Sequence, residues 1–272
     1  MKNILVATDL SPKAENAARV GMALAAQFKA EIHFLNVVDT PVDWAKLPKG
    51  HEDRFPEVKA RIGAARASLD ELQRTASAMD LNASHFISYS NGSKSVLQHI
   101  RSHDHDLVVI GAHSRLTVSD VLFGSVATEV IQGSTVPVLL VDETTEYSRL
   151  SSVLVAVDPH AEPLSMICTV AALFPSSEVA LKAFAIDPKG DTANGKLLEG
   201  LRSVQDQVRP HVTYESVPSK SVEQGIIEKA NSKEGEILVI GPNRFEGIAD
   251  YMRAHVFPSI SGRITIPLLI LK

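Results

Sequence analysis

The sequence predicts an α/β protein of two tandem domains, each a five-stranded parallel sheet with helices on both faces. Two observations support this prediction. Short apolar runs alternate with longer amphipathic stretches along the chain, which is the pattern of a parallel sheet with right-handed helical crossovers. The pattern also occurs twice, because residues 106–141 align without a gap to residues 236–271. We therefore expect one structural unit that is repeated within the chain.

The repeat is supported at both ends of each copy. In each aligned segment an acidic residue precedes an apolar run, a glycine follows the run, and a proline-led apolar strand closes the segment. The glycines are Gly111 and Gly241. The openings match as well, since NILVATDLS at residues 3–11 resembles SVLVAVDPH at residues 152–160. The second half of the chain is therefore expected to fold like the first.

The junction between the copies is the polar stretch DETTEYSRLSS, residues 142–152. We place the two domains at residues 1–146 and 147–272. A chain of 272 residues is long enough for two modest domains. Its 44% of apolar and 22% of charged residues allow a sizeable core and exclude a disordered chain.

Composition also excludes classes of function. The net charge of −5 argues against a nucleic-acid binder, because a phosphate backbone requires a basic face. The single cysteine, Cys168, excludes an internal disulfide, suits a reducing compartment and lies in an apolar run that favours a packing role. No segment reaches the roughly 20 apolar residues of a membrane span, and the first apolar run is too short for a signal peptide. We expect a soluble, cytoplasmic protein that does not bind membranes.

The first domain begins with the strand ILVAT, an apolar run that is typical of a strand buried on both faces. A helix follows over residues 12–29, with Ser11 as its N-cap and Pro12 at its first position. The remaining elements alternate in the same way: strand 31–38, helix 57–79, strand 84–90, helix 94–101, strand 106–110, helix 120–132 and strand 136–141. The second domain repeats the five strands at residues 152–157, 179–186, 211–217, 236–240 and 266–271.

The predicted topology indicates where a ligand would bind. Open parallel sheets bind ligands beyond the carboxyl ends of their strands, near the point where the strand order reverses. In the first domain Asp9 follows the first strand, Val37 and Val38 end the second, and Gly111 ends the fourth. A ligand site is therefore expected at this edge.

Gly111 and the pair Gly124-Ser125 favour an anion at this edge. Backbone N–H groups at the start of the following helix attract a phosphate, and Ser125 adds a hydrogen-bond donor. Asp9 would accept a hydrogen bond from a ribose hydroxyl or hold a metal ion beside the phosphates. The alternative is structural, with Gly111 forming a tight turn and Asp9 capping the first helix. Their convergence at one edge favours the ligand site.

These motifs resemble those of the universal stress protein family. ATP-binding members of the family carry Gly-x2-Gly-x9-Gly-Ser/Thr after the fourth strand, and this sequence has Gly111-x2-Ser114-x9-Gly124-Ser125. VATDLS resembles the family's first strand, and NVVDTP resembles the end of its second strand. The resemblance covers the whole chain as two tandem family domains. It implies a Rossmann-like fold with strand order 3-2-1-4-5 in each domain.

The resemblance also implies a binding site for ATP, with Mg²⁺. The implied contacts are Ala7, Asp9 and Val37 for the base and ribose, Ile110 and Gly111 for the ribose and α-phosphate, and Gly124, Ser125 and Val126 for the terminal phosphates. Ser114 departs from the family pattern, and its side chain either crowds the phosphates or donates a hydrogen bond to them. We therefore expect a usable site with one altered member.

The second domain departs further from the pattern. Asp158 persists, but Arg244, Ala254 and His255 occupy the remaining phosphate-binding positions. No Gly-Ser pair is left there, and Arg244 could fill the phosphate space with its own charge. We expect a degenerate site in a domain that serves as a structural partner.

Three other segments allow a functional interpretation. GDTANGKL at residues 190–197 nearly matches a phosphate-binding loop, but Leu197 replaces the residue that would bind Mg²⁺, which favours a surface loop. In HIRSHDHD the spacing of His99 and His103 permits a metal ion, but no carboxylate or cysteine completes a known spacing, which favours a solvated helix end. Trp44 lies in a long proline-bearing connection that is either a lid over the ligand or a surface for interaction.

Two functions are compatible with these observations. We favour a cytosolic stress-response protein that binds ATP in its first domain and acts as a nucleotide-dependent regulator. At most slow ATP hydrolysis is expected, because no residue pattern nominates a catalytic group. The alternative is a nucleotide-free scaffold of the same fold that acts through homodimer formation and an unidentified protein partner. Asp9, Gly124 and Ser125 favour the regulator, whereas Ser114 and the losses in the second domain favour the scaffold.

Overall fold

The computed structural model describes residues 1–89, 92–112, 125–143, 145, 147, 149–158, 163–175, 178–187, 212–232, 235–241, 260 and 262–272. These residues form two compact units. The first unit contains residues 2–112 and 125–143, and the second contains the described residues from 145 onward. The division lies close to the predicted junction, while the domain boundary after residue 146 stays a prediction.

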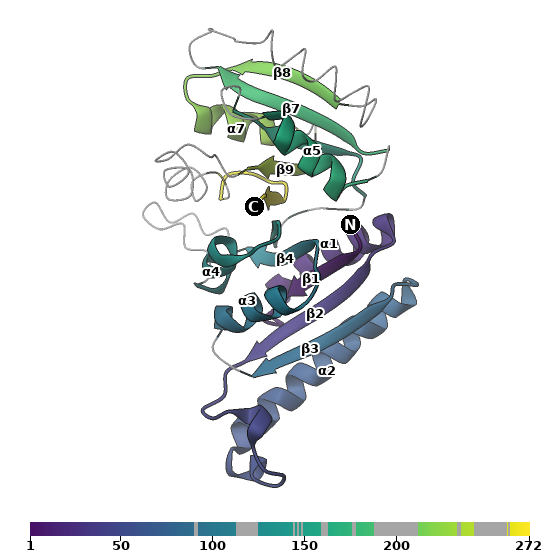
Figure 1. Ribbon diagram of the computed structural model, residues 1–272, viewed down its shortest axis with the longest axis vertical. Coiled ribbons are helices and arrows are strands. Elements are labelled where there is room, and N and C mark those ends of the chain that lie inside the picture. The colour runs from purple at the N-terminus through teal and green to yellow at the C-terminus, as the bar shows by residue number, and fades with distance from the viewer. Residues whose placement is uncertain are drawn as a thin grey trace. The chain divides into compact units, whose positions relative to one another are not determined.

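The first unit is a five-stranded parallel sheet with helices between its strands (Figure 1). Its strands are β1 (Asn3–Ala7), β2 (Glu31–Val38), β3 (Ala83–Tyr89), β4 (Leu107–Ala112) and β5 (Val138–Asp142). Its helices are α1 (Pro12–Phe28), α2 (Pro56–Ala78), α3 (Gly92–Ser102) and α4 (Ser125–Gly133). Neighbouring strands pair in parallel in the order β3-β2-β1-β4-β5. This confirms the predicted strand order and the alternation of strands and helices.

Helices cover both faces of this sheet. On one face, α1 approaches so closely that a Cβ atom on Gly21 would lie 2.7 Å from Cγ2 of Val6. His85 of β3 lies on that face by strand register and contacts α2. Phe86, the next residue of β3, points to the opposite face and packs against His99 of α3, with ring centroids 4.9 Å apart. The strands are therefore buried on both sides, which explains why they consist of apolar runs.

Helix α1 begins as the sequence predicts. The hydroxyl Oγ of Ser11 accepts the backbone N–H of Ala14 at 3.3 Å, and Pro12 occupies the first turn. The helix ends at Phe28, and Lys29 takes a left-handed conformation with φ of 54°. These caps satisfy backbone groups that a helix leaves unpaired at its ends.

The second unit repeats the architecture of the first (Figure 1). Its described elements are β6 (Ser152–Ala156), α5 (Pro163–Leu173), β7 (Ala180–Asp187), β8 (Val212–Pro218), α7 (Val222–Ala230), β9 (Ile237–Ile240) and β10 (Leu268–Ile270). The strand order β8-β7-β6-β9-β10 corresponds to β3-β2-β1-β4-β5 of the first unit. Both sheets are therefore built on the same plan.

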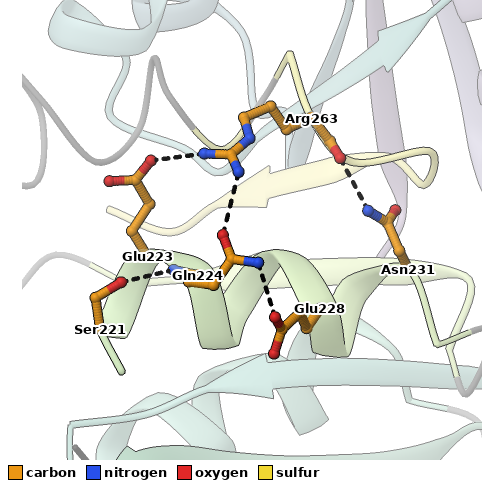
Figure 2. A network of polar contacts seen from close by, with 6 residues as sticks. All are labelled: Ser221, Glu223, Gln224, Glu228, Asn231 and Arg263. Carbon is orange, nitrogen blue, oxygen red and sulfur yellow. Dashed lines mark hydrogen bonds and ion pairs between the residues drawn. The ribbon is translucent and has the colours of Figure 1, made fainter. Parts of the chain in front are cut away.

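A polar network fixes the turn before β10 to α7 in the second unit (Figure 2). The guanidinium of Arg263 donates to Oε1 of Glu223 at 3.1 Å and to Oε1 of Gln224 at 3.2 Å. Nδ2 of Asn231 donates to the carbonyl oxygen of Arg263 at 2.9 Å, while Ser221 caps the helix by accepting the N–H of Gln224. These groups are exposed, so each contact contributes little by itself. The network links the turn before the last strand to α7.

Within the part of the chain that the structure describes, no helix is both long and apolar enough to span a membrane.

Candidate functional site

The turn between β1 and α1 in the first unit is held by buried polar groups. The backbone N–H of Thr8 donates to the carbonyl oxygen of Leu35 at 2.9 Å, and Oγ1 of Thr8 accepts the N–H of Leu10 at 3.0 Å. From β2, Nδ2 of Asn36 donates to the carbonyl oxygen of Thr8 at 2.8 Å. The exposed carboxylate of Asp9 accepts the N–H of Ser11 at 2.9 Å through Oδ1. Asp9 therefore braces the turn, and the helix cap itself is Ser11.

Three of the predicted nucleotide-contacting residues, Ala7, Val37 and Ile110, lie on one face of the sheet near its carboxyl edge. Ala7 pairs in register with Leu35 on one side and with Ile110 on the other. Val37 lies two residues beyond Leu35 on β2 and so points to the same face. Ala7 and Ile110 are buried and Val37 is half-buried. Together they form an apolar face that ends beside Asp9, and α3 and α4 cover this side of the sheet.

The predicted phosphate-binding residues are only partly described. Gly111 follows Ile110 on β4 and pairs with Val141 of β5. Ser125 and Val126 are the first two residues of α4 as described, and the first backbone N–H groups of a helix have no partner within the helix. The predicted Ser114 and Gly124 lie outside the described residues.

Two residues of this edge were not predicted from the sequence. Thr8 and Asn36 are nearly fully buried, and their hydrogen bonds join the β1–α1 turn to β2. The sequence did contain a signal for them, since each is a polar residue inside or just after an apolar strand. A polar residue at such a position is expected to be buried and therefore to need a hydrogen-bond partner. Leu10, with φ of 60°, is a further feature of this turn, since few residues other than glycine adopt that conformation.

The connection that contains Trp44 packs beside the same turn. It contains two short 3₁₀ helices, η1 (Trp44–Lys46) and η2 (Glu52–Arg54). The rings of Trp44 and Phe55 meet edge to face with centroids 6.2 Å apart. Both residues and Leu10 pack against an apolar cluster formed by Val38, Val58, Ile62 and Ala65. The connection is thus anchored on α2, and its interpretation as a lid stays a prediction.

The second unit keeps the backbone hydrogen bond of this edge, but apolar residues replace the two buried polar residues. The N–H of Val157 donates to the carbonyl oxygen of Phe184 at 2.9 Å, which corresponds to the bond between Thr8 and Leu35. Val157 and Ala185 stand at the positions of Thr8 and Asn36, and both are apolar. At the glycine that ends β9, a Cβ atom on Gly241 would lie 2.8 Å from Sδ of Met166. The side chain of Met166 therefore fills the space beside this glycine.

The predicted phosphate-position residues of the second domain, Arg244, Ala254 and His255, lie outside the described residues. The segment 190–197 lies outside them as well.

The end of α3 is exposed from Arg101 to Asp104, as expected, but not all histidines of HIRSHDHD are solvated, which corrects part of that expectation. His99 is half-buried and His105 is buried, while His103 is exposed. Their rings gather with His33 of β2, because Nδ1 of His33 lies 3.0 Å from Nε2 of His105. Among the described residues no group of three or more His, Cys, Asp or Glu side chains is arranged to hold a metal ion.

The fold of this chain resembles the folds of known structures. No curated protein sequence matches the chain. A universal stress protein from Archaeoglobus fulgidus DSM 4304 superposes with a TM-score of 0.69 at 20% identity, over 99% of this chain and 96% of that one. A protein from Pseudomonas aeruginosa UCBPP-PA14, provisionally described as a universal stress protein, gives 0.64 at 13% identity over 100% and 93%.

A shorter structure, a universal stress protein in complex with cAMP, gives a TM-score of 0.43 at 21% identity over 52% of this chain and 97% of that one. The two longer structures share the fold of this chain over nearly its whole length. In sequence, the model of the universal stress protein family matches residues 1–142, which is more than half of the chain. The chain therefore belongs to the universal stress protein family.

Proposed function

We propose that the first unit binds ATP at the carboxyl edge of its sheet and that the protein acts as a nucleotide-dependent regulator of a stress response. The observation that supports this most strongly is the convergence of Ala7, Val37 and Ile110 on one apolar face beside Asp9. Apolar side chains next to an exposed carboxylate suit a base and a ribose, because the base requires dispersion contacts and the ribose offers hydroxyl donors.

Each residue has a defined role in this proposal. Asp9 uses Oδ1 for the N–H of Ser11, and its carboxylate accepts a ribose hydroxyl with its remaining lone pairs. Gly111 lets the backbone approach the α-phosphate. The start of α4, with Ser125 and Val126, directs backbone N–H groups at the terminal phosphates. Ser114 and Gly124 complete the cradle. Mg²⁺ would accompany ATP through the phosphate oxygens.

We infer one nucleotide per chain. In the second unit apolar side chains replace the buried polar pair that braces the turn in the first, and Met166 packs against Gly241. A ligand that follows the strand-ending glycine would meet this thioether. The domains at residues 1–146 and 147–272 would thus differ in ligand binding while sharing a fold. Homodimer formation and an unidentified protein partner remain predictions from the resemblance.

Calorimetry with Mg-ATP tests the proposal on three proteins. Wild type is expected to bind one equivalent. Gly124→Val is expected to lose binding, because a branched side chain would press on the phosphates and remove a charge-assisted contact that is typically worth about 1.5–3 kcal/mol. Ala254→Val is the matched control, and it should bind like wild type. Titrations with ADP, AMP and cAMP show which phosphates matter.

The scaffold is the second candidate function, and the serine at position 114 favours it. A side chain at this position of the cradle crowds the phosphates unless its hydroxyl donates to them. Absence of ATP binding by wild type, together with no nucleotide in the denatured purified protein, would establish the scaffold instead. Two equal sites, or binding that is unchanged in Gly124→Val, would contradict the single-site proposal.

A further inference from the structure

Four imidazole rings gather at the amino end of the first sheet, away from the candidate nucleotide site. His33 is the third residue of β2, His99 lies on α3, and His103 and His105 lie between α3 and β4. The rings of His99 and His103 stack with centroids 4.0 Å apart, and those of His33 and His105 meet edge to face at 5.2 Å. Phe86 packs against three of them. We name this group the histidine cluster.

The histidine cluster is the interface that joins the end of α3 to the sheet. His105 is 5% exposed, and ring nitrogens of His99 and His105 are buried without a hydrogen-bond partner among the described residues. His103 contacts the carbonyl oxygen of His99 through Nδ1 at 3.0 Å. Because a carbonyl oxygen only accepts, this Nδ1 carries the proton. Charging His99 and His105 would put cations at buried ring nitrogens with little water around them.

The contact between His33 and His105 requires at least one neutral ring. Nδ1 of His33 and Nε2 of His105 are 3.0 Å apart, so one nitrogen donates a proton and the other offers a lone pair. When both rings are protonated, both nitrogens carry hydrogen and the contact becomes repulsive. The stacked rings of His99 and His103 face the same difficulty as two cations.

Nearby charges compensate this repulsion only in part. On β2, Oε2 of Glu31 is 3.9 Å from Nε2 of His33 and is half exposed. Before β4, the carboxylate of Asp106 already accepts the backbone N–H groups of Lys2 and Asn3. Other charged groups on the surrounding elements include Lys2 before β1, Arg101 on α3, Asp104 before β4, Glu129 on α4 and the amino terminus, and the side chains named here are exposed.

Burial is the main influence on these rings. Together with the smaller effect of the neighbouring histidines, it lowers the pKa of His99 and of His105 from 6.5 to about 4. Burial also lowers the pKa of His33, which Glu31 partly offsets. The unfolded chain therefore takes up protons before the folded one as the pH falls. The contribution of His99 and His105 to the free energy of unfolding is fully present above about pH 6.5 and is lost progressively as the pH falls toward about 4.

We propose that the histidine cluster is a proton-sensitive lock, which holds α3 on the sheet while its rings are neutral and releases α3 when they are protonated. The lock responds to acid through the packing of the first unit and needs no ligand. It goes beyond nucleotide binding, since it lies at the opposite end of the strands from the candidate site.

Urea unfolding of the full chain between pH 5 and 7 tests the lock, with fluorescence of Trp44 as the readout. Trp44 is the only tryptophan, so its signal reports on the first unit. In wild type the equilibrium constant of unfolding is expected to rise as the pH falls. Each extra proton taken up on unfolding raises it by up to about tenfold per pH unit, so His99 and His105 together raise it by up to about a hundredfold per pH unit. The double variant His99→Gln/His105→Gln should lose most of the pH dependence of its unfolding constant, whether it is more or less stable than wild type. His51→Gln, outside the cluster, should keep it.

Two measurements on wild type keep the test independent of how the variant folds. A proton titration of the imidazole resonances should place His99 and His105 well below the ordinary pKa of histidine. Amide exchange, corrected for its intrinsic pH dependence, should show α3 losing protection at pH 5 while α1 keeps it. Ordinary pKa values for both rings, equal slopes for wild type and the double variant, or uniform loss of protection would overturn the proposal.

Discussion

Asn36 fixes the geometry of the candidate site at the scale of one residue. Its buried amide donates to the carbonyl oxygen of Thr8, and the hydroxyl of Thr8 accepts the N–H of Leu10. Leu10 has φ of 60°, a conformation that costs a residue with a side chain on the order of 1–2 kcal/mol. The two hydrogen bonds hold the turn in this conformation, and the turn in turn presents Asp9 at the edge of the sheet.

Asn36→Ala is expected to destabilise the first unit by about 1–3 kcal/mol, because the carbonyl oxygen of Thr8 would be left buried without its donor. The same change should weaken ATP binding, since the turn that presents Asp9 loses its brace. Urea unfolding followed by Trp44 fluorescence measures the first effect and calorimetry the second. Asn82→Ala is the control, because the side chain of Asn82 donates to the exposed carboxylate of Glu31 and its loss should change stability by less than about 0.5 kcal/mol. Equal losses in the two variants would contradict this reasoning.

The sequence predicted single residues where the signal is local and missed them where it is not. Ser11 and Pro12 form a cap within a few positions of each other, and the cap is confirmed. The bond between Asn36 and Thr8, and the contact between His33 and His105, join segments far apart in the chain. Spacing along the sequence holds no information about such partners until the strands are placed side by side. For this reason the expectation of a solvated helix end did not include the burial of His105 against His33.

At the scale of elements, burial on both faces made the strands predictable. A strand that is covered by helices on each side must be apolar throughout, so its ends are visible where polar residues begin. The prediction for β2 coincides with Glu31–Val38. The connection from residue 39 to residue 55 was not predictable in the same way. Its short 3₁₀ helices depend on how Trp44 and Phe55 pack against α2, and no periodicity marks such contacts.

Gly21→Ala and Gly63→Ala should change stability in opposite directions. A Cβ atom on Gly21 of α1 would lie 2.7 Å from Val6 of β1, so either the helix or the strand must move, at a cost of about 1–3 kcal/mol. A Cβ atom on Gly63 of α2 meets nothing within 4 Å, so alanine there should stabilise the helix by up to about 1 kcal/mol. Denaturant unfolding of both variants measures the difference. Stabilisation by Gly21→Ala would contradict the close packing of α1 on β1.

At the scale of the whole molecule, two copies of one fold differ at the edge where a ligand would bind. The strand order and the hydrogen bond after the first strand are the same in both units. The polar pair at Thr8 and Asn36 is replaced by apolar residues in the second unit. The sequence predicted this divergence only at the phosphate-binding positions. The loss of the polar brace became visible once the strands were aligned in register.

Saturating Mg-ATP should therefore stabilise the first unit alone. Binding at a ligand concentration 100 times Kd adds about 2.7 kcal/mol to the stability of the unit that binds, because ATP contacts the folded edge and not the unfolded chain. Amide exchange with and without Mg-ATP measures this separately in each unit of the intact protein. We expect slower exchange in β1, β2, β4 and the start of α4, with exchange in β6, β7 and β9 unchanged. The control is Gly124→Val, in which ATP should leave both units unaffected. Equal protection of β1 and β6 by ATP would show that the second unit has kept a working site despite Val157, Ala185 and Met166.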